Sequence, residues 1–341
     1  MVEENAPFSN DDMELLHQVS DGFAKLQQEI GKVIVGQDEI VRQLLAAIFC
    51  QGHVLIVGVP GLAKTLLVKT LAQALGWRFK RIQFTPDMMP SDIIGMELLH
   101  EDPKSGTRDW KFMHGPIFAN ILLADEINRT PPKTQSALLE GMQEYTVTSM
   151  GTSHKLERPF IVVATQNPIE QEGTYPLPEA QLDRFMFSLW MDYPSREEEE
   201  DIVLNILPGA EYEVEQVFSR EQMITFQQFV QRIPVSRHVA RYAVAISRAT
   251  RPANEEAGPY VQKYVEWGCG PRASQYMIQA AKALAALDGK TTVETAHVRA
   301  AASYILRHRV LPNYNATGEG VTALQIVEKI IADVKEPDYV A

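Results

Sequence analysis

The chain has 341 residues, a length that suggests about two domains and allows a sizeable core. No run of about 18 apolar residues occurs and the N-terminal MVEENAPFSNDD is acidic and polar, so neither a membrane span nor a secretory signal is predicted and a cytoplasmic location is expected. The net charge of −12 argues against a broad nucleic-acid-binding surface. Cys50 and Cys269 stand apart from each other and from histidine clusters, which indicates neither a disulfide framework nor a zinc site.

The first motif along the chain is a glycine-containing loop between a strand and a helix. Residues 53–57, HVLIV, are predicted to form a buried strand, and residues 65–75, TLLVKTLAQAL, an amphipathic helix. The intervening GVPGLAKT resembles the phosphate-loop pattern, whose glycines let backbone N–H groups approach phosphates, whose lysine reaches the β- and γ-phosphates and whose hydroxyl holds Mg²⁺. The alternative is a plain strand-turn-helix with a chance Lys-Thr pair. The predicted ATP-binding residues here are Gly58, Val59, Pro60, Gly61, Leu62, Ala63, Lys64, Thr65 and Leu66.

Ala63 departs from the pattern, which has glycine at this position. It directly precedes Lys64, where the loop is expected to turn into the helix. A residue with right-handed helical dihedrals tolerates a β-carbon, so we expect Ala63 to have helical dihedrals and the departure to be mild.

Four further apolar runs alternate with helical patterns, which predicts a parallel sheet with helices on both faces. A phosphate loop needs a second strand that ends in an acid, and the second of these runs continues into Asp125 and Glu126. Asp125 is expected to help hold Mg²⁺ and Glu126 to polarise the attacking water, because a strand end would place both carboxylates beside the neighbouring phosphate loop. The alternative is an acidic turn. The runs are WRFKRIQF (77–84), ANILLAD (119–125), FIVVATQ (160–166) and RFMFSLWM (184–191).

Three more polar residues are candidates for the site. Asn167 follows the strand candidate FIVVATQ, where its amide could orient water, although Asn-Pro is also an ordinary turn signal. Arg184 precedes a strand, and Arg272 begins a helix after Pro271, from which it is expected to swing toward the phosphates. An arginine can neutralise charge that develops on a transferred phosphoryl group, and the alternative for each is a surface ion pair with an acid such as Asp183.

A change of composition after MDYP (191–194) marks a second unit. Ser195 and Glu198 form a predicted capping box at the start of a helix. Only helical patterns follow, at 224–233, 238–250, 272–290 and 292–306. We therefore expect a nucleotide-binding core over residues 1–192 and a small all-α domain over residues 193–341.

Together these segments resemble AAA+ ATPases, and more closely the MoxR family. The resemblance runs from about residue 20 to the end and is more specific in the first unit than in the second. The family's pattern accepts alanine before the loop lysine. The segments that carry it are VIVGQDEIVRQLL (33–45), GVPGLAKT (58–65), RIQFTPDMMPSDIIG (81–95), ADEINRTPPKTQSALLEGMQE (124–144), ATQNP (164–168) and PEAQLDRF (178–185).

The resemblance implies an α/β fold, a P-loop core with a parallel five-stranded sheet followed by a helical lid, and Mg²⁺-dependent ATP hydrolysis in a ring, usually a hexamer. Lys64, Thr65, Asp125 and Glu126 match the two Walker motifs, with Thr65 and Asp125 toward Mg²⁺. Asn167 matches sensor 1, Arg272 matches sensor 2 of the lid, and Arg184 matches the finger that reaches the next subunit's nucleotide. The backbone of Val35 and Gly36 falls where the family contacts adenine.

The resemblance also implies two substrate-handling devices and a cellular role. An insert near residues 89–110 would face the pore and a hairpin near residues 145–160 the substrate; the residues alone indicate for the second only a hairpin with a Gly-containing turn. MoxR-type ATPases are chaperone-like remodelers of protein complexes or metal-cofactor enzymes, often with a partner that carries a von Willebrand factor A domain.

Three alternatives share parts of this pattern. An MCM-like DNA motor is disfavoured by the acidic charge and by the lack of a DNA-binding module. A metal-chelatase motor subunit would be similar in fold and finger motif. A small-molecule kinase would need neither Arg184 in trans nor so long a helical lid.

Overall fold

A five-stranded parallel sheet forms the centre of the first unit, in the order β2-β5-β8-β1-β9. The computed structural model describes residues 8–101, 108–170, 172–205 and 213–337. All five strands fall within the runs predicted from sequence, so the expected α/β core is confirmed. The strands are β1 (Val54–Val57), β2 (Phe79–Gln83), β5 (Ile121–Asp125), β8 (Ile161–Gln166) and β9 (Phe187–Trp190).

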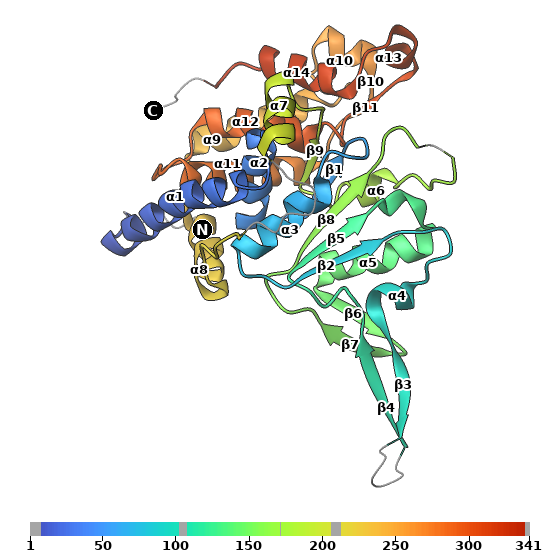
Figure 1. Ribbon diagram of the computed structural model, residues 1–341. Coiled ribbons are helices and arrows are strands. Elements are labelled where there is room, and N and C mark those ends of the chain that lie inside the picture. Colours follow the sequence, from blue (N-terminus) through green and yellow to red (C-terminus); the bar gives the residue numbers. More distant parts are fainter. Residues whose placement is uncertain (1–7, 102–107, 171, 206–212, 338–341) are drawn as a thin grey trace.

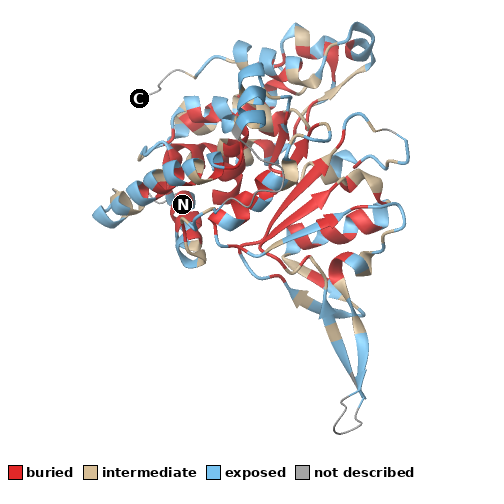
Figure 2. Cartoon of the chain, in the orientation of Figure 1, coloured by how far each residue is buried: buried red, intermediate tan, exposed pale blue. Residues whose placement is uncertain are grey.

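The two faces of the sheet bury separate sets of side chains, because successive residues of a strand point to opposite faces. Val54 and Ile56 of β1 pack with the helices on one face, whereas Leu55 and Val57 pack on the other. The first face is covered by α1 (Asn10–Gly31), α2 (Asp38–Phe49), α3 (Lys64–Ala74) and helices of the second unit. The other face is covered by α4 (Pro90–Ile94) and α5 (Pro132–Glu144), and Figure 2 shows the buried residues concentrated along these contacts.

The second unit is a helical lid, as predicted, with one small exception. The predicted capping box at Ser195 and Glu198 is present, since each backbone N–H donates to the other side chain. Two strands too short to give an alternating pattern, β10 (Val265–Trp267) and β11 (Leu311–Pro312), pair antiparallel where only helices were expected. The helices are α7 (Arg196–Asn205), α8 (Arg220–Arg232), α9 (Arg237–Ala249), α10 (Pro259–Tyr264), α11 (Pro271–Leu287), α12 (Thr295–Leu306), α13 (Tyr314–Glu319) and α14 (Ala323–Asp333).

Two hairpins project from the core on the side of α4 and α5 (Figure 1). The longer pairs β3 (Gly95–Glu101) with β4 (Arg108–His114), and residues 102–107 of the expected insert lie outside the described residues. The shorter pairs β6 (Thr146–Ser149) with β7 (Thr152–Lys155), which confirms the hairpin predicted over residues 145–160. Short helical turns at η1 (Ile127–Arg129) and α6 (Glu179–Leu182) complete the core. Within the described ranges, none of the helices has the length and apolar character needed to cross a membrane.

Candidate nucleotide-binding site

The predicted phosphate-site residues meet at the carboxyl edge of the sheet. The GVPGLAKT loop follows β1, Asn167 follows β8, and Asp125 ends β5. The expectation that the acids follow the strand next to the loop is wrong in detail, because β8 lies between β1 and β5. The Gly58 N–H donates to the Gln166 carbonyl over 3.2 Å, which places Asn167 directly beside the start of the loop. Asn167 is therefore interposed between the loop and the two acids.

The loop enters α3 through a strained residue. Ala63 is the N-cap of α3 and has φ 54° and ψ 22°, in the left-handed region, so the expectation of right-handed helical dihedrals is wrong. For a residue with a β-carbon this conformation costs about 1–2 kcal/mol. Glycine would adopt it freely, which is the physical reason that the phosphate-loop pattern has glycine at this position.

Lys64 lies within the curve of its own loop. Its ammonium donates to the carbonyls of Gly58 and Val59, over 2.5 and 2.9 Å. Burial lowers the pKa of Lys64, while the nearby Asp125 and Glu126 carboxylates oppose that shift. An ammonium held against two neutral carbonyls is ready to exchange them for phosphate oxygens, which bind it more strongly.

Both acids are held by polar partners. Asp125 accepts the Thr165 hydroxyl over 2.6 Å and, on its other oxygen, Arg81 Nε and Nη2 over 3.0 and 2.7 Å. Glu126 accepts the amide of Gln83 over 2.8 Å and pairs with Arg129 over 2.8 Å. Arg81 and Gln83 were not predicted from the sequence. The two residues are two positions apart in a predicted strand, so the sequence indicated that their side chains point to the same face. That this strand, β2, lies next to β5 and its acids follows only from the strand order.

The residues present fit a magnesium ion and a nucleotide. The Thr65 hydroxyl, in the first turn of α3, and the Asp125 carboxylate are the oxygen donors that Mg²⁺ prefers. Asp125 already accommodates a cation, since the Arg81 guanidinium contacts it directly. Leu66 is partly exposed in the same first turn of α3. Asn167 is buried and its Oδ1 accepts the Ile169 N–H over 3.1 Å.

Val35 and Gly36 lie between α1 and α2 and connect to the loop through residues 191–198. Gln37 donates its side-chain amide to the Asp192 carbonyl over 3.1 Å. A β-carbon on Gly36 would lie 2.1 Å from a Glu198 carboxylate oxygen, and one on Gly58 would lie 2.9 Å from the Met191 carbonyl. Residues 191–198 therefore pack against both the expected adenine-contacting segment and the first glycine of the loop.

Arg184 and Arg272 lie at the opposite edge of the sheet. Together they line a hollow of about 270 Å³ with residues 50–53, which precede β1, whereas the phosphate loop follows β1. The length of β1, at about 3.3 Å per residue, separates residues 50–53 at its start from the phosphate loop at its end by about 10 Å. The expectation that Arg272 would swing toward its own chain's phosphates therefore does not fit this placement, although Arg272 does lie in the first turn of α11.

The hollow around the two arginines suits an anion. None of the described residues that line it is acidic, and the others are neutral groups such as Gln143 and Tyr276. His53 is among them, and burial lowers its pKa to about 4, so it is neutral at pH 7. Outside this lining, Arg272 pairs with Asp183 over 2.7 Å, which is the alternative predicted for Arg272 from the sequence. The structure thus shows two guanidinium groups, from the core and the lid, at one edge.

Comparisons with known proteins agree with this architecture. Residues 53–187 match a family described as "ATPase family associated with various cellular activities (AAA)", and residues 259–330 match an AAA lid domain. The chain is 40% identical to Chaperone MoxR1 of Mycobacterium tuberculosis, over 91% of this chain and 81% of that one. It is 30% identical to Protein MoxR of Methylorubrum extorquens, over 85% and 88%. A crystal structure of a suggested ATPase from Cytophaga hutchinsonii superimposes with a TM-score of 0.87 at 39% identity, covering 95% of this chain and 98% of that one.

Proposed function

The chain belongs to the MoxR family of AAA+ ATPases, and from that premise we propose that it hydrolyses ATP, with Mg²⁺, at sites shared between the subunits of a ring. One observation carries the proposal. The phosphate loop and the acids lie at one edge of the sheet, while Arg184 and Arg272 lie at the other. Within one subunit Arg184 and Arg272 therefore lie away from the phosphate site, where Arg81 and Arg129 are already paired with the acids, and a neighbouring subunit would supply the two missing arginines.

In this proposal the cis residues bind and orient the nucleotide. Lys64 exchanges its two loop carbonyls for the β- and γ-phosphates, and Val35 and Gly36 contact the adenine with their backbone. Thr65 and Asp125 would hold Mg²⁺, which would neutralise part of the phosphate charge when bound. Glu126 accepts a proton from the attacking water, and Asn167 fixes that water with its amide.

The trans residues complete the site. Arg184 and Arg272 of the neighbouring subunit stabilise the charge that develops on the γ-phosphoryl oxygens, a contribution of roughly 10³–10⁵ in rate for an arginine supplied in trans. A closed ring, which we propose to be a hexamer, gives every subunit such a neighbour. We place the division between core and lid at residues 192 and 193.

The work done by hydrolysis is proposed to be the remodeling of protein complexes, including enzymes that carry metal cofactors. The name of the 40% identical relative, Chaperone MoxR1, supports a protein client. The two hairpins are the proposed client-facing elements, and a protein with a von Willebrand factor A domain is the proposed adaptor. We do not propose nucleic acid as a substrate, because the net charge of −12 opposes binding to phosphate backbones.

Mixed rings test the shared site. Lys64→Ala should abolish most ATP affinity in calorimetry, and Glu126→Gln should keep ATP bound but not hydrolyse it. Arg184→Ala should lose hydrolysis, and part of the activity should return when its subunits are mixed with Lys64→Ala subunits, because an intact arginine then meets an intact loop. Mixing Lys64→Ala with Glu126→Gln should restore nothing. Full activity of Arg184→Ala by itself would contradict the shared site.

A further inference from the structure

Arg309 is a buried charged residue that the proposed mechanism does not use. Its side chain is 3% exposed, and it follows α12 in the lid. Each of its guanidinium nitrogens has a partner in the core segment that carries Arg184. Nε donates to Asp183 Oδ1 over 2.7 Å, Nη2 to the carbonyls of Asp183 and Phe185 over 2.9 and 2.7 Å, and Nη1 to the Met186 carbonyl over 3.3 Å. Arg309 of the lid thus forms hydrogen bonds with Asp183 and Phe185, the two residues that flank Arg184.

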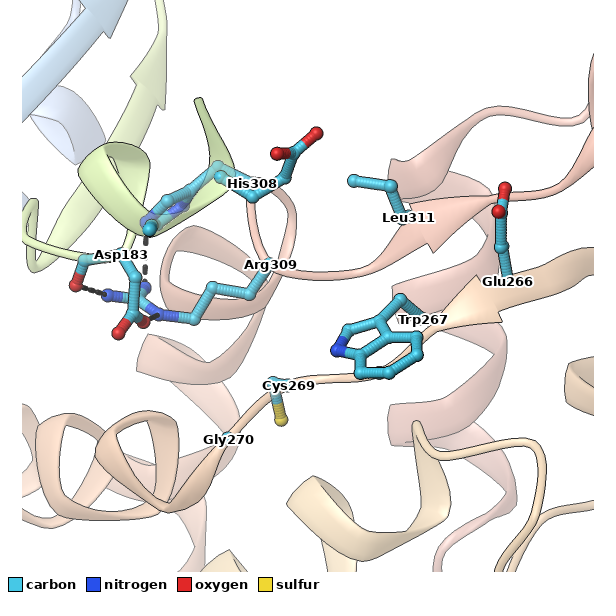
Figure 3. Close-up of a pocket in the computed structure, with 11 residues that line it drawn as sticks. Asp183, Glu266, Trp267, Cys269, Gly270, His308, Arg309 and Leu311 are labelled. Carbon is cyan, nitrogen blue, oxygen red and sulfur yellow. Dashed lines mark hydrogen bonds and ion pairs between the residues drawn. The ribbon is translucent and has the colours of Figure 1, made fainter. Parts of the chain in front are cut away.

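Asp183 extends this link to the second arginine. Its Oδ1 accepts from Arg309, and its Oδ2 accepts from Arg272 Nη1 over 2.7 Å. The Asp183 carboxylate therefore links Arg272, in the first turn of α11, to Arg309, which follows α12. Asp183 is also the residue directly before Arg184. Figure 3 shows Asp183 and Arg309 facing one another at the side of a hollow of about 450 Å³ between core and lid.

The local charges make Asp183 indispensable to this arrangement. Its carboxylate contacts the guanidinium groups of both Arg272 and Arg309, and Arg309 is buried, where a charge without a partner is strongly unfavourable. His308 next to Arg309 adds no positive charge, because burial and the neighbouring guanidinium hold its pKa well below the usual range. The Asp183 carboxylate therefore lies between two guanidinium groups and offsets their charge, directly before Arg184 in the chain.

We propose that Asp183 and Arg309 are positioning residues that hold Arg184 and Arg272 as one unit toward the nucleotide of the neighbouring subunit. The inference rests on the proposed function, since it assigns a purpose to the arrangement only if the two arginines act in trans. Neither residue touches the nucleotide. Their effect is geometric, and a displacement of about 1 Å at a reacting centre is enough to cost about 10²-fold in rate.

The test replaces Asp183 with asparagine, which has the same shape but a single acceptor oxygen. That oxygen can keep Arg309, and the amide N–H groups then face Arg272 and release it. We expect ATP hydrolysis by Asp183→Asn rings to fall at least about tenfold. ATP affinity, measured by calorimetry in the Glu126→Gln background, should stay within about twofold, because Lys64 and the rest of the cis site are intact.

Mixed rings separate positioning from general damage. Mixing Asp183→Asn with Lys64→Ala subunits should restore activity, and mixing it with Arg184→Ala subunits should not, because both then lack the trans element. The matched control is Asp288→Asn, which removes the carboxylate of another ion pair between core and lid, Arg42–Asp288, 2.8 Å long and away from the arginines. It should keep activity within about twofold.

Two outcomes would overturn the inference. One is wild-type hydrolysis by Asp183→Asn. The other is a loss that Lys64→Ala subunits fail to restore although they do restore Arg184→Ala, since the defect would then be one of folding. The proposed function fails in a different way, namely if Arg184→Ala rings keep full activity or cannot be restored by Lys64→Ala subunits.

Discussion

Ala63 and Glu126 share an unusual backbone conformation, and both border the candidate phosphate site. Their φ angles are 54° and 56°, and each is the N-cap of a helical segment, α3 and η1 respectively. Side chains with a β-carbon rarely adopt this region, and strained residues gather at functional sites where the surrounding structure enforces them. At both positions the chain must turn sharply from a strand end or a loop into a helix while keeping the adjacent polar groups at the sheet edge.

The strain at Ala63 leads to a stability prediction. Ala63→Gly should raise the free energy of unfolding by about 0.5–1 kcal/mol, because relief of the left-handed strain exceeds the extra backbone entropy of glycine in the unfolded chain. Gly61→Ala is the matched control. Gly61 has φ +89° and nothing within 4 Å of an added β-carbon, so its substitution should be destabilising through the backbone alone. Urea unfolding of both variants checks this, and a less stable Ala63→Gly protein would contradict it.

The buried His53 leads to a pH prediction. Its Nδ1 accepts the Val162 N–H over 3.0 Å and its Nε2 faces the Met142 carbonyl over 2.9 Å, so the neutral ring is satisfied. Burial lowers the pKa of His53 from 6.5 to about 4, whereas the unfolded chain keeps the ordinary value. Below about pH 6.5 the unfolded state binds a proton at His53 that the folded state does not bind. His53 therefore costs no stability above about pH 6.5, and the free energy of unfolding decreases as the pH falls toward 4.

The loss from this residue should reach roughly 3 kcal/mol by pH 4. Urea unfolding between about pH 7 and 4 measures it against His53→Gln, which does not titrate. The variant should be less stable at neutral pH but should show a shallower decline. His297 and His308 also have lowered pKa values and titrate alike in both proteins, so the difference isolates His53. Parallel pH profiles for the two proteins would rule out this assignment.

At the scale of elements, the longer hairpin is unusual because it exposes apolar side chains along its length. Leu99 and Trp110 are cross-strand partners in the β3–β4 register and are 51% and 68% exposed. The base of the same hairpin is anchored, because Phe112 stacks on His154 of the shorter hairpin with ring centroids 3.8 Å apart. The anchored base with an apolar outer part is consistent with the proposed contact to a protein client.

Trp110→Ser should therefore separate client binding from stability. The free energy of unfolding should change by no more than about 0.5 kcal/mol, since the side chain is largely exposed. Binding of a fluorescent, permanently unfolded protein in the presence of ATP should weaken several-fold, measured by anisotropy in the Glu126→Gln background. Tyr314→Ser, at an 89% exposed position of the lid, is the control and should bind as before. Equal binding by Trp110→Ser would remove the hairpin from the client site.

At the scale of the whole molecule, core and lid form one packed body. A continuous apolar cluster joins Leu44 of α2 and Val68 of α3 with Phe226 of α8 and Leu284 of α11. The lid is fastened further by Arg309, and the arginines remain at the edge of the sheet opposite the phosphate loop. The candidate phosphate site and the arginine pair thus lie on different sides of the molecule, as the proposed sharing of a site between subunits requires.

This geometry predicts that catalysis depends on protein concentration. The specific ATPase rate should rise with concentration as subunits assemble and should be very low in the dilute, monomeric sample, because each monomer lacks trans arginines. Sedimentation velocity at the same concentrations, with ATP present, should show assembly over the range in which the rate rises. A dilute monomer with the full specific rate would show that one subunit suffices.

The sequence by itself determined the local elements and indicated which residues make up the candidate site. The five apolar runs, the glycine loop before Lys64 and the adjacent acids at the end of β5 could all be predicted, because strand periodicity and phosphate-binding chemistry depend on residues that are near in sequence. The tertiary structure alone decided which of these groups meet. The insertion of β8 between β1 and β5, the pairing of Arg81 with Asp125, and the placement of Arg272 beside Arg184 all depend on strand order and on how the lid packs. The dihedrals of Ala63 were also decided there, because the turn required between a fixed strand and a fixed helix overrides local preference.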